Sequence, residues 1–181
     1  MVHVFLAEGF EEIEALTVVD ILRRAGIEVC MVSVTGSREV TGAHGVCVKA
    51  DVTFDEAPCL EESEMLLLPG GMPGALNLRN HSNLCALLLN HCEKGSPVAA
   101  ICAAPFILGE LGILEGKKAT CYPGFEKQLG GAIHTADMVV KDGMIVTGKG
   151  PAAAADFSFA IVRMLKGESD VCMLKQGMLF D

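Results

Sequence analysis

Short runs of consecutive apolar residues alternate along the chain with longer segments whose apolar positions recur every three or four residues. The short runs lack the polar alternation of a half-exposed strand, which is typical of parallel strands buried on both faces. The longer segments have the periodicity of amphipathic helices. On this pattern we expect strands at 2–6, 27–34, 65–68, 98–101 and 118–121, short extended pieces within 40–52, and helices at 11–25, 82–91, 106–111, 124–129 and 152–165. This order predicts an α/β fold in which helices cover both faces of a mostly parallel central sheet.

Turn and capping residues support several of these boundaries. Ser82 stands where an N-cap is expected at the start of a helix. Asp142-Gly143 separates two extended runs, at 138–141 and 144–147, and this dipeptide is typical of a tight hairpin turn.

Three chemically distinctive segments follow predicted strands. The acidic residues 11–14 follow the first strand, Gly70-Gly71 follow the leucine-rich strand, and Cys102 follows the next apolar run. In open α/β sheets, ligands bind at the edge where the carboxyl ends of the strands lie. We therefore expect these segments to meet in one site.

Cys102 has the sequence context of a nucleophile elbow. It stands between an apolar strand and a helical segment, and the small residues Ala103 and Ala104 leave room for a sharp turn. A helix N-terminus beside the sulfur favours the thiolate, so we expect a lowered pKa for this thiol. The alternative is a buried structural cysteine that packs as a small hydrophobic residue.

The glycine-rich loop after the leucine-rich strand offers backbone donors to the same place. The N–H groups of Gly71 and Ala103 could form an oxyanion hole beside Cys102. The loop lacks the G-K-[ST] sequence of a phosphate-binding loop, and the first strand lacks G-x-G-x-x-G. The alternative is that the glycines only permit a turn.

Three glutamates open the first predicted helix. Helical spacing places Glu11 and Glu14 on one face and turns Glu12 away, and it predicts that Ile13 and Leu16 are buried. A carboxyl buried against a cysteine would have a raised pKa and could donate a hydrogen bond to the sulfur. The alternative is that all three acids interact only with the helix dipole.

Composition narrows the class of protein. We expect the 181 residues to form a single domain, 1–181. The net charge of −9 argues against a nucleic-acid partner, and no apolar run reaches the roughly 18 residues of a membrane helix. The first residues lack the pattern of a secretory leader, so we expect a cytoplasmic protein.

Cysteine and histidine usage argues against metal and peptidase chemistry. There are 8 cysteines but no C-x-x-C, so we expect reduced thiols, no metal site and no cofactor. A cysteine hydrolase usually needs a histidine base, and none follows Cys102. Of the five histidines, His44 lies in a glycine-rich turn from which it could reach a neighbouring pocket.

With these residues in place, the chain resembles the ThiJ/PfpI superfamily, and within it the parkinsonism-protein and YajL-like branch. The resemblance rests on AEGFEEIE at 7–14, VDILRRAG at 19–26, LLPGG at 67–71, AAICA at 99–103, KDG at 141–143 and GP at 150–151. These segments lie in family order over nearly the whole chain. The resemblance implies a flavodoxin-like three-layer α/β sandwich, related to class I glutamine amidotransferases, that works as a homodimer.

The resemblance also implies roles for individual residues. Cys102 would be the reactive, easily oxidised cysteine, and Glu14 the protonated carboxyl bonded to it. The pocket would be completed by backbone donors, by its wall residues and by an arginine that approaches from the partner subunit: Gly70, Gly71, Ala103, Gly150, Pro151 and Arg24.

Three positions depart from the family pattern. Ala103 stands where the protease-like branch has histidine, Tyr122 replaces a pocket histidine of members described as glyoxalases, and His44 aligns with a pocket arginine. The resemblance implies a cofactor-independent cysteine enzyme of the glyoxalase or deglycase type, acting on reactive carbonyls in stress protection. The alternative is a redox sensor with a chaperone-like output that uses the same cysteine. A peptidase or amidase ranks third.

Overall fold

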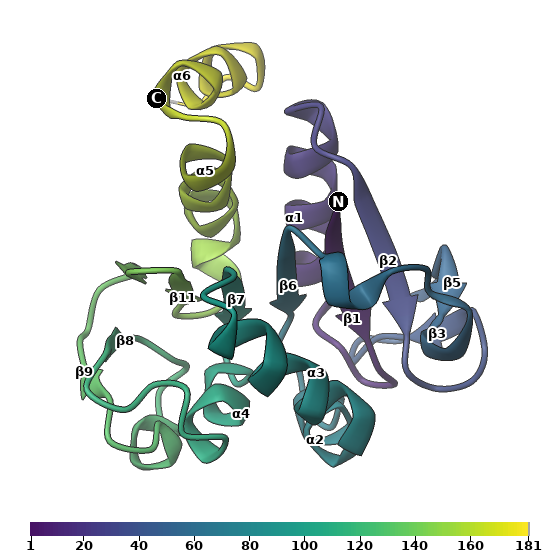
Figure 1. Ribbon diagram of the computed structural model, residues 1–181. Coiled ribbons are helices and arrows are strands. Elements are labelled where there is room, and N and C mark those ends of the chain that lie inside the picture. Colours follow the sequence, from purple (N-terminus) through teal and green to yellow (C-terminus); the bar gives the residue numbers. More distant parts are fainter. Residues whose placement is uncertain (181) are drawn as a thin grey trace.

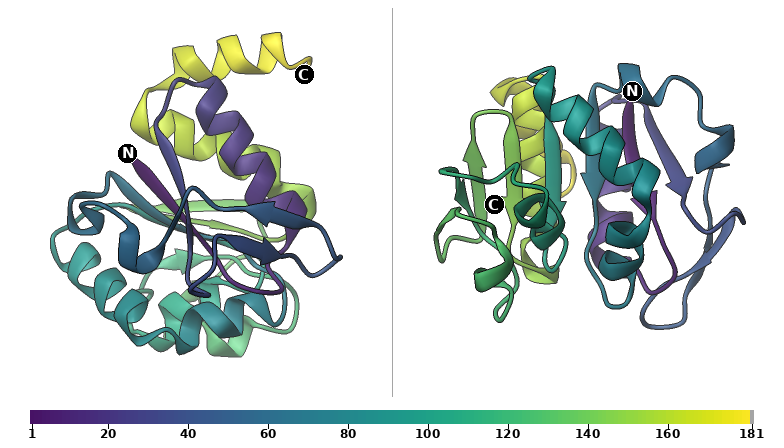
Figure 2. Two further views of the ribbon diagram at one scale, coloured as in Figure 1. Left: turned by 90° about the vertical axis from the view of Figure 1, so that its right-hand side faces the viewer. Right: turned by 60° about the horizontal axis from the view of Figure 1, so that its bottom comes forward.

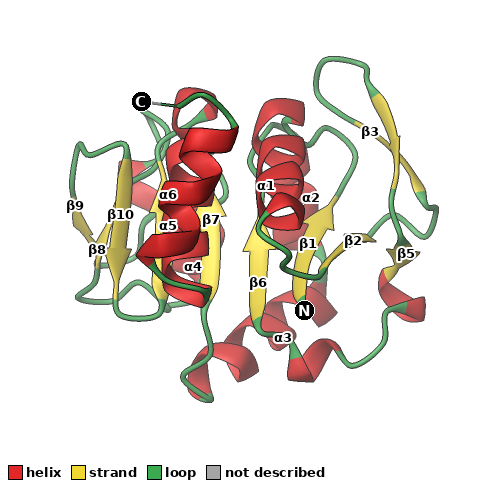
Figure 3. Ribbon diagram, turned by 90° about the horizontal axis from the view of Figure 1, so that it is seen from above, coloured by secondary structure: helices red, strands yellow, loops and turns green. Residues whose placement is uncertain are grey.

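The apolar runs form the strands of a seven-stranded central sheet. The computed structural model describes residues 1–180. In spatial order the strands are β10 (Val139–Asp142), β11 (Ile145–Gly148), β7 (Val98–Ile101), β6 (Met65–Leu68), β1 (Val2–Leu6), β2 (Val29–Ser33) and β5 (Val52–Thr53), as Figure 3 shows for most of them. All neighbouring pairs are parallel except β10 with β11, which form the expected hairpin.

Helices cover both faces of this sheet (Figures 1 and 2). One face carries α1 (Glu12–Arg24), α5 (Ala154–Leu165) and α6 (Glu168–Gly177). The other carries α2 (Gly74–Asn80), α3 (Ser82–Glu93) and α4 (Pro105–Glu110). Short 3-10 turns at Phe54–Glu56, Leu60–Glu62, Glu126–Gln128 and Pro151–Ala153 connect these elements. The predicted three-layer, mostly parallel α/β sandwich is confirmed.

Strand residues supply two separate cores because successive side chains point to opposite faces of the sheet. Val4 packs in the core beneath α1 and α5, whereas its neighbour Phe5 packs in the core beneath α3 and α4. Both side chains are fully buried. Burial on both faces explains why the central strands read as continuous apolar runs.

Two small sheets lie outside the central one. β3 (Glu39–Thr41) and β4 (Cys47–Lys49) form an antiparallel hairpin. β8 (Lys118–Ala119) pairs in parallel with β9 (Ile133–His134). The strand predicted at 118–121 is therefore shorter than expected and belongs to this separate pair.

Three expectations about helices need correction. Helices α2 and α6 were not expected, and the helix predicted at 124–129 is only a 3-10 turn. His81, not Ser82, caps α3: its Nδ1 accepts the N–H of Leu84 at 3.1 Å. Among residues 1–180, no helix is both long and apolar enough to span a membrane.

The strand order reverses direction between β1 and β6. From β1 the chain proceeds outward to β2 and β5, whereas from β6 it proceeds the other way to β7 and β11. Ligand sites of such sheets lie where the loops diverge. Here the loops after the two strands are tied together, because Glu11 N–H donates to Gly70 O at 2.9 Å and Gly74 N–H to Gly9 O at 3.2 Å.

Candidate active site around Cys102

Cys102 lies in a sharp turn directly after β7. Its φ of 65° is unusual for a residue with a side chain and costs of the order of 1–3 kcal/mol. Two backbone hydrogen bonds hold the turn: Cys102 N–H donates to Gly148 O at 2.9 Å, and Tyr122 N–H donates to Cys102 O at 2.8 Å. The side chain is almost buried, with 8% of the residue exposed. This geometry has the features of a nucleophile elbow.

Two backbone amides face the sulfur. The N–H groups of Ala103 and Gly71 both act to lower the pKa of the Cys102 thiol. Gly71 adopts a φ of +88°, and a Cβ at this position would lie 2.4 Å from the backbone nitrogen of Glu11. A side chain there would force the loop away from the sulfur. Glycine at position 71 therefore allows the loop to place this N–H group beside Cys102.

The Glu14 carboxyl closes the other side of the sulfur. Glu14 is fully buried, and its carboxyl and the Cys102 thiol shift each other's pKa. Its Oε2 accepts the Gly70 N–H at 2.8 Å, whereas Oε1 has no partner within residues 1–180. Gly70 lies between the Cys102 and Glu14 side chains and in close contact with both. A Cβ at this position would lie 2.6 Å from both Cys102 Cβ and Glu14 Oε2.

Burial raises the pKa values of both Glu14 and Cys102. Desolvation raises the pKa of Glu14 to about 7, against the opposing hydrogen bonds from Cys102 and Gly70. Desolvation, and then the Glu14 carboxylate, raises the pKa of the Cys102 thiol, while the amides of Ala103 and Gly71 lower it. With Glu14 ionised, the Cys102 pKa therefore lies above the free value and not below it, contrary to expectation. Helix α4 begins three residues after the sulfur, and the thiol is governed by burial and by Glu14.

The two other glutamates of the first helix have structural partners. Glu11 is the N-cap of α1, and its Oε2 accepts the Glu14 N–H at 2.7 Å. Glu12 is buried, contrary to expectation. Its Oε1 accepts the N–H groups of His44 and Val46 at 2.8 and 3.3 Å, and its Oε2 lies 2.9 Å from His44 Nδ1.

Glu12 thus anchors the turn between β3 and β4 to the start of α1. His44 belongs to this turn and is largely exposed, and its Nδ1 lies 3.9 Å from Glu11 Oε1. The three side chains offer ligand atoms within 4.8 Å of one another, but both carboxylates already accept hydrogen bonds from the chain. Hydrogen bonds to His44 lower the pKa of Glu12, and the Glu12 carboxylate raises the pKa of His44.

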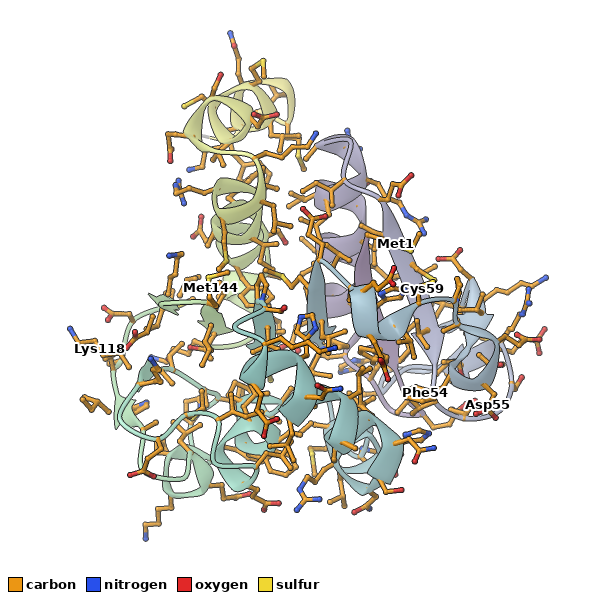
Figure 4. All side chains as sticks on the ribbon, in the orientation of Figure 1. Met1, Phe54, Asp55, Cys59, Lys118 and Met144 are labelled. Atoms are coloured by element: carbon orange, nitrogen blue, oxygen red, sulfur yellow. The ribbon has the colours of Figure 1, made fainter. Side chains whose placement is uncertain are left out.

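The remaining expected pocket residues divide into two groups. Tyr122, Gly150 and Pro151 line an apolar groove next to the Cys102 turn. Arg24 lies at the far end of α1, exposed and paired with Asp20 at 2.7 Å, so within this chain it is not part of the Cys102 site. A cavity of about 480 Å³ lies at the opposite edge of the sheet, where Met144 (labelled in Figure 4) lines it.

The structure also adds residues that sequence reasoning missed. Gly148 fixes the Cys102 N–H, and Met138 and Lys149 line the groove with Tyr122. The signal for Gly148 was its position at the end of a buried strand, β11, which is the parallel neighbour of β7. Met138 and Lys149 carried no such signal.

The surface of α1 also differs from expectation. Ile13 is 56% exposed and Leu16 is 36% exposed, although helical spacing placed both in the core. The buried positions of α1 are instead those facing α5 and the sheet, such as Val18 and Leu22. Two large aliphatic side chains are therefore left on the outer face of α1 near the start of the helix.

Known proteins share this fold and sequence. Protein dj-1beta of Drosophila melanogaster is 36% identical over 179 residues, covering 97% of this chain and 95% of the relative. The protein named deglycase PH1704 of Pyrococcus horikoshii is 34% identical over 162 residues, covering 88% and 96%. The solved structure of oxidized Toxoplasma gondii DJ-1 superposes with a TM-score of 0.93 at 36% identity, covering 99% of this chain and 97% of that chain.

Two further relatives are much longer than this chain. DJ-1 homologs A and B of Arabidopsis thaliana are 37% and 34% identical, and the chain spans 44% and 40% of their lengths. The model of the DJ-1/PfpI family matches residues 1–164. By sequence, fold and the strand-to-cysteine turn, this chain belongs to the DJ-1/PfpI family.

Proposed function

We propose that this protein is a cysteine enzyme that converts reactive α-oxoaldehydes, or their early adducts, to 2-hydroxy acids, using only groups of its own chain. The observation that carries the proposal is the arrangement around Cys102: one buried carboxyl and two backbone N–H groups converge on the sulfur. Its relative PH1704 is named a deglycase, which is a related carbonyl chemistry.

The first step forms a carbon–sulfur bond. The Cys102 thiolate adds to the aldehyde carbon, and the electron pair of the carbonyl moves onto oxygen. The N–H groups of Gly71 and Ala103 stabilise that oxyanion. Glu14 then gives the oxygen its proton, which produces a neutral hemithioacetal and leaves a carboxylate.

The second step moves a proton within the bound substrate. The Glu14 carboxylate removes the hydrogen of the former aldehyde carbon, and the electrons pass to the neighbouring carbonyl oxygen. That proton returns to the neighbouring carbon as the C=O bond of the former aldehyde carbon forms, and the hydroxyl proton on that carbon passes to the neighbouring oxyanion. The product is a thioester of a 2-hydroxy acid. Water hydrolyses the thioester, releasing the acid and the Cys102 thiol. A carboxyl with a pKa of about 7 can give and accept a proton near neutral pH.

The test is turnover by purified protein. Methylglyoxal should be converted to lactate by the wild type and not by Cys102→Ala, with Cys92→Ala as a matched control. Absence of turnover above the Cys102→Ala background would contradict the enzymatic proposal. Peptidase activity is disfavoured because the described groups bonded to Cys102 include no histidine.

A second candidate function is redox sensing, and one observation favours it. The sulfur already faces two N–H donors and a carboxyl that can donate, which together suit an oxidised, anionic sulfinate. The solved Toxoplasma relative is described as oxidized. Peroxide oxidation without methylglyoxal turnover would favour this second function.

We also propose that the protein is a cytoplasmic homodimer whose interface includes the outer face of α1. The exposed Ile13 and Leu16 support this, since large aliphatic side chains on a surface helix gain from being covered. Arg24 on the same helix would then approach the partner's site. Light scattering should show a dimer at micromolar concentration, and Ile13→Glu should shift it to monomer. A wild-type monomer would remove Arg24 from the site.

A further inference from the structure

An apolar groove runs alongside the Cys102 turn. It has a volume of about 200 Å³ and is lined chiefly by Tyr122, Pro123, Met138, Lys149, Gly150 and Pro151. Tyr122 is 47% exposed and Met138 is 43% exposed, so neither side chain is committed to the core. The groove consists almost entirely of apolar surface.

Both walls of the groove are fixed to the backbone of Cys102. On one side the Tyr122 N–H donates to Cys102 O at 2.8 Å. On the other side the Cys102 N–H donates to Gly148 O at 2.9 Å, and Lys149 and Gly150 follow directly. The groove therefore lies at a fixed position relative to the backbone of Cys102.

The two walls also contact each other through the ring of Tyr122. A Cβ on Gly150 would lie 3.2 Å from Tyr122 Cδ2, so the ring rests against this glycine. The backbone N–H of Lys149 donates to Met138 O at 2.9 Å, and the Nζ of Lys149 donates to Ala136 O at 3.1 Å. The Lys149 ammonium thus already has a backbone acceptor, whereas the Tyr122 ring faces the apolar groove.

We propose that this groove receives a flat aromatic substituent carried by the carbonyl substrate, and that Tyr122 determines the preference for it. The inference rests on the proposed function and specifies its substrate class as aryl α-oxoaldehydes. An apolar cavity of about 150 Å³ is large enough to bind benzene, so the groove admits one six-membered ring. A methyl group would leave most of it empty.

Aromatic contact with Tyr122 supplies the selectivity. Offset or edge contacts between rings contribute about 0.5–1.5 kcal/mol beyond burial, which corresponds to about 2- to 12-fold in rate or affinity. The contact needs the ring of Tyr122 but not its hydroxyl. Tyr122→Phe should therefore keep the preference, and Tyr122→Ala should remove it.

The first measurement does not depend on turnover. The protein would be reacted separately with iodoacetamide and with N-benzyl iodoacetamide. Peptide mass mapping would then measure the rate at which each cysteine is alkylated. The exposed Cys47 and Cys172 report the intrinsic reactivity of the two reagents. Relative to these thiols, Cys102 should prefer the benzyl reagent about 3- to 10-fold in the wild type and in Tyr122→Phe. The preference should disappear in Tyr122→Ala.

Two further variants test whether a change in the alkylation preference is specific to the groove. Met138→Lys introduces a charge into the groove and should also remove the preference. Met144→Ala changes a similarly exposed methionine at the opposite edge of the sheet and should leave it intact. No benzyl preference at wild-type Cys102, or an equal preference in Tyr122→Ala, would overturn the proposal.

The second measurement separates this inference from the proposed function. In initial-rate assays, kcat/KM for phenylglyoxal relative to methylglyoxal should fall about 3- to 10-fold in Tyr122→Ala. If neither aldehyde is turned over but the alkylation preference is present, the groove stands and the enzymatic proposal fails. If both are turned over with a ratio unaffected by Tyr122→Ala, the enzymatic proposal stands and this inference is wrong.

Discussion

The Glu14 carboxyl lies beside the Cys102 side chain in a buried site, and its Oε1 has no hydrogen-bond partner within residues 1–180. Two anions here would repel each other in a poorly solvated space, so the pair loses one proton readily and holds the second. When the charge is on sulfur, it meets the Ala103 and Gly71 N–H groups and the Glu14 O–H. When it is on the carboxylate, it meets the Gly70 N–H and the Cys102 S–H. The donors therefore favour a thiolate beside a protonated Glu14.

The alkylation rate of Cys102 should depend on pH differently from that of the exposed thiols. The pair loses its first proton near the Glu14 pKa of about 7, so the rate should rise around that pH. Exposed thiols such as Cys47 should instead follow the free value of about 8.5. Iodoacetamide labelling from pH 5 to 9 with peptide mapping measures both profiles. Coincident profiles would contradict the shared proton.

Substitutions of Glu14 should locate that proton. Glu14→Gln keeps a neutral donor beside the sulfur, whereas Glu14→Asp withdraws the carboxyl by one methylene. We therefore expect a lower Cys102 pKa in Glu14→Gln than in Glu14→Asp. Thiolate absorbance near 240 nm, followed as a function of pH and referenced to Cys102→Ala, measures the difference. The reverse order would place the proton on sulfur.

Gly70→Ala should damage the site more than the fold. The added methyl group would lie 2.6 Å from both Cys102 Cβ and Glu14 Oε2, so one of these side chains must move. We expect a loss of about 1–3 kcal/mol in the free energy of unfolding, as for other overpacked positions, and loss of the distinct Cys102 pH profile. Gly177→Ala is the matched control, because its Cβ meets nothing within 4 Å. Urea unfolding and labelling test both effects, and a wild-type labelling profile in Gly70→Ala would refute the close packing.

Two buried histidines should make the protein sensitive to acid. His91 Nε2 lies 3.0 Å from Pro97 O, which only accepts, so this nitrogen carries the proton and Nδ1 has no partner within residues 1–180. Ser63 Oγ donates to Leu60 O, so His3 Nδ1 donates to Ser63 Oγ, and its Nε2 also lacks a partner. Protonation would leave each with a buried N–H lacking an acceptor.

Burial lowers the pKa of both histidines, so the folded chain binds fewer protons than the unfolded chain below about pH 6.5. Their stabilising contribution is complete above that pH and is lost as the pH falls through the folded pKa values. His91→Gln can still donate to Pro97 O but does not titrate. Urea unfolding at pH 7.5, 6.5 and 5.5 should show a smaller acid loss in His91→Gln than in the wild type. Equal losses would exclude His91 as a cause.

Mild peroxide should carry Cys102 to the sulfinate. The oxygens of a sulfinate would meet the Ala103 and Gly71 N–H groups and a protonated Glu14. All 8 cysteines are free, and Cys121 is buried next to Tyr122. Intact mass after graded peroxide should show a gain of two oxygens on the Cys102 peptide. A Cys102–Cys121 disulfide as the main product would instead indicate a dithiol switch.

The sequence predicted the parts of the site that follow directly from strand ends. Cys102, Gly71 and Ala103 could be placed together because parallel strands bring their carboxyl ends to one edge. The function of Glu12 could not be predicted, since its partners lie in a turn more than thirty residues away and the acidic pattern of a first helical turn is common.

The outward position of Ile13 was also missed, and for a related physical reason. Periodicity identifies an apolar face of a helix but does not say whether the sheet or something outside the chain covers it. The rise in the Cys102 pKa beside an ionised Glu14 could not be anticipated, because the sequence does not show how deeply a thiol is buried or how near a carboxyl comes. Helices α2 and α6 were missed because they are short and carry weak periodicity.

The chemical environment of Cys102 is assembled from three segments that are distant along the chain. Glu14 lies in the first turn of α1, Gly70 and Gly71 follow β6, and Cys102 follows β7. In an unfolded chain none of these groups would be near the sulfur, and Cys102 would behave as one ordinary thiol among eight. The unusual ionisation of Cys102 therefore depends on the native fold and would be present only in folded molecules. A chain that is still being synthesised, or one that has lost its fold, should have neither the reactivity nor the sensitivity to oxidants that we predict for the folded protein.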